Sequence, residues 1–239
     1  MKAIKNLTIT LFIIFSSNIF SQDGISYSLS ADIVSKYIWR GIEISENPNF
    51  QTNLCLSYTK NWGAVEFGLW SSLTFNEAFS EADFYLKYSY LTENIGKFSL
   101  CLYDYYYPFN DKEFNDFSGD GEGAHTLDLI FDYEGPKSFP ITFQFSKILY
   151  NNFPDNGSIY LELGYLWDLE SFSFKFLTSA AEGRSLTYLI DSEKFQINSI
   201  GLNFNTQLSF SESFNLPVDF GFHRNLNLDK NFFYLVFSF

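Results

Sequence analysis

Basic side chains are scarce in this sequence. The 239 residues include 15 Lys and Arg against 28 Asp and Glu, which gives a formal net charge of -13. Nucleic-acid binding depends on clustered Lys and Arg that face the phosphates, and no run of basic residues occurs. We therefore expect no nucleic-acid partner.

Histidine is scarcer still, with His125 and His223 far apart in the chain. A zinc site needs several Cys or His ligands at defined spacing, and neither histidine has a second ligand at such a spacing. The segment 116–121 imitates the first half of a calcium loop, but Leu127 stands where the bidentate Glu belongs. We predict no metal and no cofactor.

Long apolar runs are also missing after the N-terminus. Residues 1–21 combine Lys2 and Lys5, an apolar stretch at 7–15 and a small polar close, which is typical of a secretory signal peptide. A membrane anchor needs about 17 to 25 apolar residues, and this stretch is shorter. Cleavage after Ser21 would take the formal net charge from -13 to -15.

Aromatic residues are abundant, at 21% of the chain, and they fall on an alternating pattern. From Tyr27 to Trp39 the odd positions are mainly apolar or aromatic, and the even positions include Asp32, Lys36 and several serines. Period-2 alternation is the signal of a strand with two different faces. The pattern predicts twelve strands, at residues 27–40, 50–59, 65–72, 81–90, 97–107, 124–134, 141–150, 158–168, 171–180, 195–209, 214–224 and 231–239.

The connections between these strands alternate in length. Short turns are predicted at 60–62, 92–96, 135–140, 168–170 and 211–213, and generally longer polar loops at 41–49, 76–80, 108–123, 151–157, 181–194 and 225–230. Short turns at one end and longer loops at the other are typical of outer-membrane barrels. We predict that residues 22–239 form an all-β, transmembrane, antiparallel up-and-down β-barrel of about 12 strands.

A soluble β-sandwich or lipocalin-like barrel would also show alternation, with its apolar face turned into a core. Charged residues in the middle of the polar faces favour a wet interior instead. The residues that we expect to line the channel are Asp32, Lys36, Arg40, Glu66, Glu81, Asp83, Lys87, Asp128, Asp132, Glu162 and Lys175.

Aromatic residues concentrate near the predicted strand ends, where the interfacial girdles of a membrane barrel lie. These residues are Tyr37, Trp39, Trp62, Trp70, Tyr105, Tyr106, Tyr107, Tyr165 and Trp167. The last strand ends on Phe239, which resembles the closing strand of bacterial outer-membrane barrels. We therefore expect outer-membrane lipid as one partner and the barrel-assembly machinery as another.

The segment 35–51 contains Ser35, Tyr37, Trp39, Arg40 and Gly41, followed by a Ser, a Pro and a Gln in the first loop. It resembles the opening of the TorF family of putative bacterial porins, in which a Ser-x-Tyr-x-aromatic-Arg-Gly pattern ends the first strand. The resemblance implies a channel-forming role in the bacterial outer membrane and no catalytic residues. Arg40 is either a charge at the mouth of the channel or the structural partner of a lumen carboxylate.

No catalytic motif accompanies the strands. An outer-membrane phospholipase places Ser two residues after its His, and Leu127 occupies that position after His125. We therefore expect no enzymatic activity. Cys55 and Cys101 lie on predicted strands that are not neighbours, so we expect two unpaired thiols.

The predicted function is a porin-like passive diffusion channel for small hydrophilic solutes. A twelve-stranded lumen is intermediate between a filled barrel and an open pore, so a narrow passage is expected. Acidic positions outnumber basic ones on the polar faces, which predicts a preference for cations. The alternative is a non-conducting outer-membrane barrel with a structural or surface-binding role.

Overall fold

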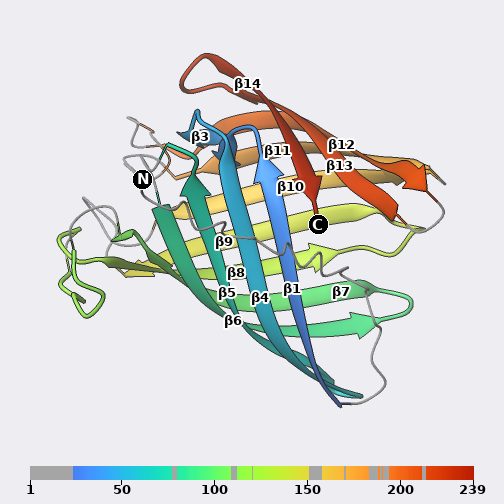
Figure 1. The fold of residues 1–239 in the computed structure, drawn as a ribbon, viewed down its shortest axis with the longest axis horizontal. Coiled ribbons are helices and arrows are strands. Elements are labelled where there is room, and N and C mark those ends of the chain that lie inside the picture. The colour runs from blue at the N-terminus through green and yellow to red at the C-terminus, as the bar shows by residue number, and fades with distance from the viewer. Residues whose placement is uncertain are drawn as a thin grey trace, which may run out of the picture.

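The computed structural model describes residues 24–76, 80–108, 112–119, 121–150, 158–169, 171–182, 188, 190, 194–211 and 214–239. The predicted signal peptide and the predicted loop at 151–157 lie outside these residues. Twelve strands of the described part close into one antiparallel barrel, and a further two strands form a separate hairpin (Figure 1). Nowhere in these ranges does a helix reach the length and apolarity needed to cross a membrane.

The ring runs in the order β1-β14-β13-β12-β11-β10-β9-β8-β7-β6-β5-β4, and β4 pairs with β1 to close it. Apart from the β2–β3 hairpin, strands that follow one another in the chain are neighbours, which confirms the predicted up-and-down arrangement. The strands are β1 (Gly24–Val34), β2 (Tyr37–Trp39), β3 (Ile42–Ser45), β4 (Asn49–Lys60), β5 (Gly63–Thr74), β6 (Ser80–Thr92), β7 (Gly96–Tyr106), β8 (His125–Glu134), β9 (Ile141–Tyr150), β10 (Ile159–Asp168), β11 (Phe172–Ala181), β12 (Gln196–Ser211), β13 (Phe214–Asn225) and β14 (Lys230–Ser238).

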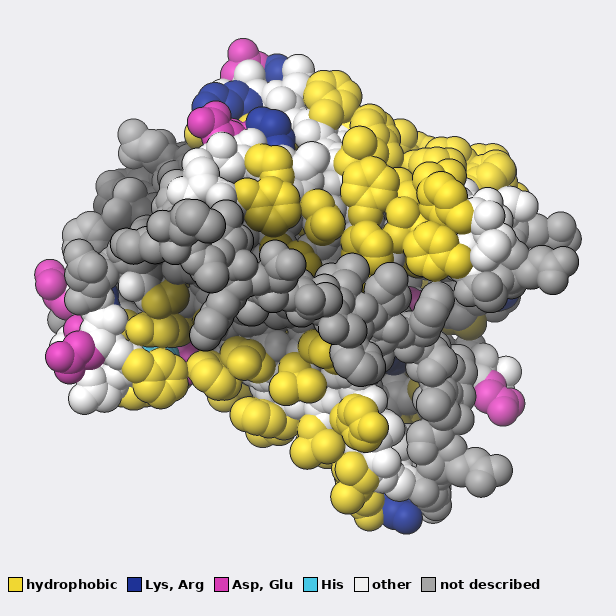
Figure 2. Space-filling model, in the orientation of Figure 1, with side chains coloured by type: hydrophobic (Ala, Val, Ile, Leu, Met, Phe, Trp, Pro, Cys, Tyr) yellow, Lys and Arg dark blue, Asp and Glu magenta, His cyan; other side chains and the backbone are white. Residues whose placement is uncertain are grey.

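The barrel has its apolar side chains outside and many of its polar ones inside. Leu54, Leu86 and Leu163 are about half exposed, whereas Glu81 and Asp128 are buried. Figure 2 shows hydrophobic side chains gathered over β12–β14 and over β4–β6. Because a soluble protein turns its apolar face inward, this polarity is the one that a lipid-facing barrel requires.

The two ends of the barrel differ, as predicted. At one end, called here the turn end, β4 and β5 are joined by two residues and β6 and β7 by three. At the other end, the loop end, β7 and β8 are separated by residues 107–124. The first strand begins at Gly24 and the last ends at Ser238, and both of these ends point toward the turn end. An antiparallel barrel with an even number of strands requires this.

The first predicted strand is wrong in its second half. The alternation predicted one strand over residues 27–40, but β1 ends at Val34 and residues 37–45 form the β2–β3 hairpin. At the break, the backbone N–H of Ser35 donates to the carbonyl of Leu235 on β14 (2.8 Å). The Ser35 hydroxyl accepts from the N–H of the same leucine (2.9 Å). The alternating pattern does not reveal this break, because apolar and polar residues alternate in the hairpin as they do in the strand.

The closure between β1 and β14 is the shortest ladder of the barrel. It has three residue pairs, from Asp32 to Val34, whereas β1 pairs with β4 over all eleven residues of β1. Two backbone hydrogen bonds between Ala31 and Phe239 (2.8 and 3.1 Å) extend it. The terminal aromatic residue that the sequence singled out therefore takes part in closing the ring.

Two glycines on the inner face give room to tyrosine rings on the neighbouring strand. Gly68 lies opposite Tyr85, and Gly221 lies opposite Tyr234. A Cβ atom at Gly221 would come within 2.0 Å of Cζ of Tyr234. Tyr234 in turn donates a hydrogen bond to Asn203 (3.1 Å). In each pair the tyrosine ring fills the space inside the barrel that the glycine, which has no side chain, leaves empty.

We expect Gly221→Ala to destabilise the barrel by about 1–3 kcal/mol, because the new methyl group must displace the Tyr234 ring. Urea unfolding followed by tryptophan fluorescence and by gel mobility of the folded form measures the loss. Gly119→Ala is the matched control, since a Cβ there meets its nearest atom at an ordinary 3.6 Å. Equal stability of the two variants would contradict the close packing at Gly221.

Candidate functional site

The β2–β3 hairpin turns on two residues, Arg40 and Gly41. Both have positive φ angles, 51° and 77°, as the two central residues of a type I′ hairpin turn do. Such a φ is uncommon for a residue with a side chain, and its conformational cost must be offset by contacts elsewhere. At Gly41 a Cβ would also come within 2.5 Å of the Ser199 hydroxyl oxygen. The Arg-Gly pair of the sequence motif is thus a sharp turn against β12.

The Arg40 guanidinium is the centre of the contacts inside the mouth. Its Nη2 donates to Oδ2 of Asp128 (2.8 Å), and its Nη1 donates to the Tyr188 hydroxyl (2.7 Å). Its Cζ lies 4.5 Å from the ring centre of Trp39 and 4.8 Å from that of Tyr160. The Arg40 side chain is 6% exposed and that of Asp128 is fully buried. The carboxylate and the aromatic faces both stabilise the buried cation.

The carboxylate of Asp128 has its own support from the barrel wall. The Ser146 hydroxyl on β9 donates to Oδ1 (2.6 Å), and the Tyr105 hydroxyl on β7 donates to Oδ2 (3.0 Å). In the ring of strands, β8 lies almost opposite β1, from which the hairpin departs. The Arg40–Asp128 bond therefore ties the two sides of the barrel together across its interior.

The backbone of the turn is held as well. The Asn198 side-chain amide on β12 donates to the Arg40 carbonyl, and the Asn225 amide on β13 donates to the Gly41 carbonyl, both at 2.9 Å. Asn198 and Asn225 are fully buried. Two amides aimed at the two turn carbonyls fix the position of the hairpin more firmly than the guanidinium alone.

Apolar packing completes the closure of the loop end. Ile42 and Ile44 of the hairpin pack against Tyr160, Ala181 and Tyr188. Burial raises the pKa of the Tyr188 phenol, so that it remains a neutral hydroxyl beside the guanidinium. The hairpin and these side chains fill the interior of the barrel at this level.

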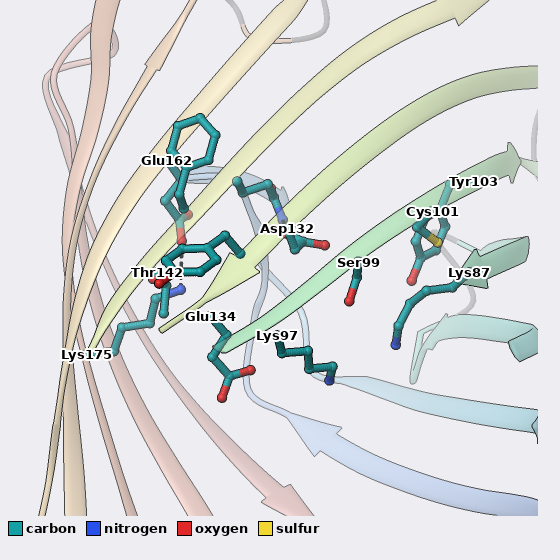
Figure 3. Close-up of a pocket in the computed structure, with 13 residues that line it drawn as sticks. Lys87, Lys97, Ser99, Cys101, Tyr103, Asp132, Glu134, Thr142, Glu162 and Lys175 are labelled. Carbon is teal, nitrogen blue, oxygen red and sulfur yellow. Dashed lines mark hydrogen bonds and ion pairs between the residues drawn. The ribbon is translucent and has the colours of Figure 1, made fainter. Parts of the chain in front are cut away.

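Below the hairpin the interior opens into a polar cavity of about 320 Å³. Figure 3 shows side chains from several strands around this space, among them Lys87, Lys97 and Ser99. Two ion pairs neutralise part of its charge, Lys87 with Glu66 (2.6 Å) and Lys175 with Glu162 (2.8 Å), and the neutral Gln144 amide donates a hydrogen bond to Asp132 (2.8 Å). The barrel is thus packed at the loop end and hollow toward the turn end.

The predicted lining residues divide between these two levels. Lys87, Asp132, Glu162 and Lys175 line the cavity, with Glu66 paired to the first of them. Arg40, Asp128, Glu81 and Asp83 are buried at the loop end. Asp32 is hydrogen-bonded to Ser238 at the seam, and Lys36 pairs with Glu43 of the hairpin (2.7 Å). Of the two alternatives for Arg40, the structure shows the pairing with a carboxylate.

The predicted aromatic girdle holds at the turn end and fails at the loop end. Trp62 and Trp167 are about half exposed near short turns. Trp39 instead packs inside, against Tyr105 and Tyr188, and Tyr37 packs against Trp70. The reason is that the hairpin folds into the barrel, which carries its aromatic residues away from the lipid-facing side.

Several partners of Arg40 escaped prediction because they carry no charge. Tyr160 and Tyr188 lie about 120 and 148 residues away in sequence, and Asn198 and Asn225 follow no motif. Their common signal is full burial of a polar side chain, which only tertiary structure reveals. The described residues contain no cluster of three or more His, Cys, Asp or Glu suited to a metal ion. Both cysteines are free, as predicted.

Comparison with known protein families finds no match for this chain, and comparison with curated proteins finds no relative.

Removing the guanidinium should destabilise the protein strongly, because it leaves Asp128 charged and buried without a cation. We expect Arg40→Ala to cost about 3–5 kcal/mol. Asp128→Asn on top of it should restore part of that loss, since the unpaired charge is gone. Urea unfolding of the single and double variants measures both.

Lys36→Ala is the matched control, because it removes a partly exposed ion pair of the same hairpin. Its expected cost is under about 1 kcal/mol. If Arg40→Ala were no more costly than Lys36→Ala, the bond across the barrel would contribute little to stability.

Proposed function

We propose that this protein is a porin-like channel of the bacterial outer membrane that passes small hydrophilic solutes through a narrow lumen. The observation that carries the proposal is the polar cavity inside a closed barrel whose outer face is apolar. Charged side chains around such a space offer hydrated solutes a path that the lipid does not.

The size of the barrel supports a narrow passage. Barrels of about eight strands are filled by side chains, and those of about sixteen hold an open channel. This barrel has twelve strands, and the β2–β3 hairpin occupies part of its interior. Passage then requires the hairpin to shift, or follows the small spaces around it.

A preference for cations follows from the balance of paired and unpaired charge. Four cations of the predicted lining are each held by a carboxylate: Lys36, Arg40, Lys87 and Lys175, with Glu43, Asp128, Glu66 and Glu162. Of the remaining acids of the predicted lining, Asp32, Glu81 and Asp83 have no lysine or arginine among their described partners, so the predicted lining carries more carboxyl groups than cations. A ring of negative charge favours cations over anions.

The sequence features give the proposal its setting. The signal-like residues 1–21 would direct export, and the closing strand that ends on Phe239 would be read by the barrel-assembly machinery. The likeness of segment 35–51 to the TorF opening fits a channel role. Export, assembly and membership of that family are parts of the same proposal.

A second candidate is a non-conducting barrel with a structural or surface-binding role. The observation that favours it is the packing of the loop end, where Asp128, Tyr160, Tyr188 and Asn198 are fully buried beneath or around the hairpin. A barrel that stays closed at this level would hold its shape in the membrane without passing solute.

Reversal potentials across a planar bilayer test the channel and its preference together. In a KCl gradient we expect single-channel steps and a reversal potential whose sign shows that K⁺ passes more easily than Cl⁻. Asp132→Asn should bring this reversal potential closer to zero, because it removes one acidic group from the lumen. Asp116→Asn is the matched control, because it removes a charge from an exposed loop outside the cavity. Anion selectivity would refute the preference, and a folded protein without steps would favour the closed barrel.

Loosening the hairpin should widen the passage. Because Arg40 ties it to the opposite wall, we expect Arg40→Ala to increase single-channel conductance. Lys36→Ala should leave conductance close to that of the wild type. Unchanged conductance in folded Arg40→Ala protein would show that the hairpin does not limit passage.

A further inference from the structure

Two buried carboxylates stand side by side at the loop end of β6. Glu81 is 4% exposed and Asp83 is 3% exposed. They are separated by one residue on a strand, so they share the inner face of the barrel. Two adjacent acids with so little access to water must be balanced by something close to them.

The protein gives these carboxylates only neutral partners. Glu81 accepts hydrogen bonds from the hydroxyls of Tyr37 and Tyr107. Asp83 accepts one from the backbone N–H of Tyr106. Each acid keeps one buried oxygen with no hydrogen-bond partner, Oε2 of Glu81 and Oδ1 of Asp83. Buried oxygens without a partner are rare in folded proteins and usually indicate an unseen proton, water or ion.

The neighbouring acids of the mouth are treated differently. Asp128 is paired with Arg40 (2.8 Å), and Asp104 lies 2.9 Å from Nδ1 of His125. Glu81 and Asp83 have no such partner among the cationic side chains that the structure describes. Glu81 and Asp83 are therefore two adjacent buried carboxyl groups without a cationic partner among the described side chains.

The tyrosines that face the pair act as neutral donors. Burial raises the pKa of Tyr37 well above its ordinary value, and the negative charges of Glu81 and Asp83 raise it further. Burial, followed by Glu81 and Asp83, raises the pKa of Tyr107 as well, while the charge of Arg40 lowers it. Neither phenol ionises near neutral pH, so both present hydroxyl groups to the two carboxyl groups.

We propose that Glu81 and Asp83 form a binding site for a hard divalent cation in the mouth of the barrel. Two carboxylates supply two negative charges and oxygen ligands, which are the chemistry that Ca²⁺ and Mg²⁺ require. Tyr37 of the β2–β3 hairpin donates to Glu81, so the bound cation lies beside the hairpin. The inference deepens the proposed cation preference, but binding at this pair requires no conduction.

Luminescence of Tb³⁺ tests the site directly, because a nearby tyrosine or tryptophan transfers excitation energy to the bound ion. We expect purified, metal-stripped protein in detergent to bind Tb³⁺ and to release it on addition of Ca²⁺. Glu81→Gln and Asp83→Asn should each weaken the competing Ca²⁺ by about tenfold or more, since each removes a charged ligand. Asp116→Asn, in the exposed loop before β8, should bind as the wild type does.

Thermal unfolding separates cation binding from a shared proton. We expect Ca²⁺ to raise the unfolding temperature of the wild type, as a ligand of the folded state does, and to leave Glu81→Gln unchanged. The variants should fold at least as well as the wild type without metal, because each removes one uncompensated buried charge. No Ca²⁺ response in the wild type, with Tb³⁺ binding equal in all variants, would overturn the proposal in favour of a proton between the two acids.

The bilayer measurement stands apart from these results. If the wild type binds cations and Glu81→Gln does not, but the protein shows no channel steps, the cation site is supported and the proposed channel function is refuted. If the channel shows cation-selective steps but Ca²⁺ changes neither the stability nor the Tb³⁺ luminescence, the proposed function is supported and the cation site is refuted.

Discussion

The closed ring of backbone hydrogen bonds is the constraint on which the rest of this structure depends. A strand in an apolar surrounding has no water to satisfy its N–H and C=O groups, so every strand must pair on both sides. Twelve strands meet that requirement by closing on themselves. Closure in turn gives the chain an inside, and alternation decides which residues occupy it. The polar lumen and the apolar outer face are consequences of this one arrangement.

The interior created by closure is too wide to be filled by strand side chains alone, and the chain fills its loop end with the β2–β3 hairpin. The hairpin can sit there because its single cation, Arg40, meets a carboxylate, a phenol and two aromatic faces at once. Burying the guanidinium charge alone would be costly, but these partners stabilise it. The hairpin therefore occupies a defined position, and the cavity begins where its contacts end.

Cationic side chains are paired with carboxylates at both levels of the lumen. In the cavity Lys87 and Lys175 meet glutamates on neighbouring strands, and at the loop end Arg40 meets Asp128. Glu81 and Asp83 depart from the rule, since their partners are hydroxyls and a backbone N–H. Two acidic groups without a cationic partner at the loop end support both the proposed cation preference and the proposed site for a cation at this pair.

The sequence by itself determined the class, the number and the pairing order of the barrel strands, because alternation and turn length are local and repeat in every hairpin. It also marked the charged residues of the inner faces, since their parity follows from the strand period. Only the tertiary structure decided that residues 37–45 fold into the barrel, because a hairpin and a continued strand share one alternation. The setting of Arg40 among Tyr160, Tyr188, Asn198 and Asn225 was likewise beyond the sequence. Those contacts join residues far apart in the chain, and their partners carry neither charge nor motif.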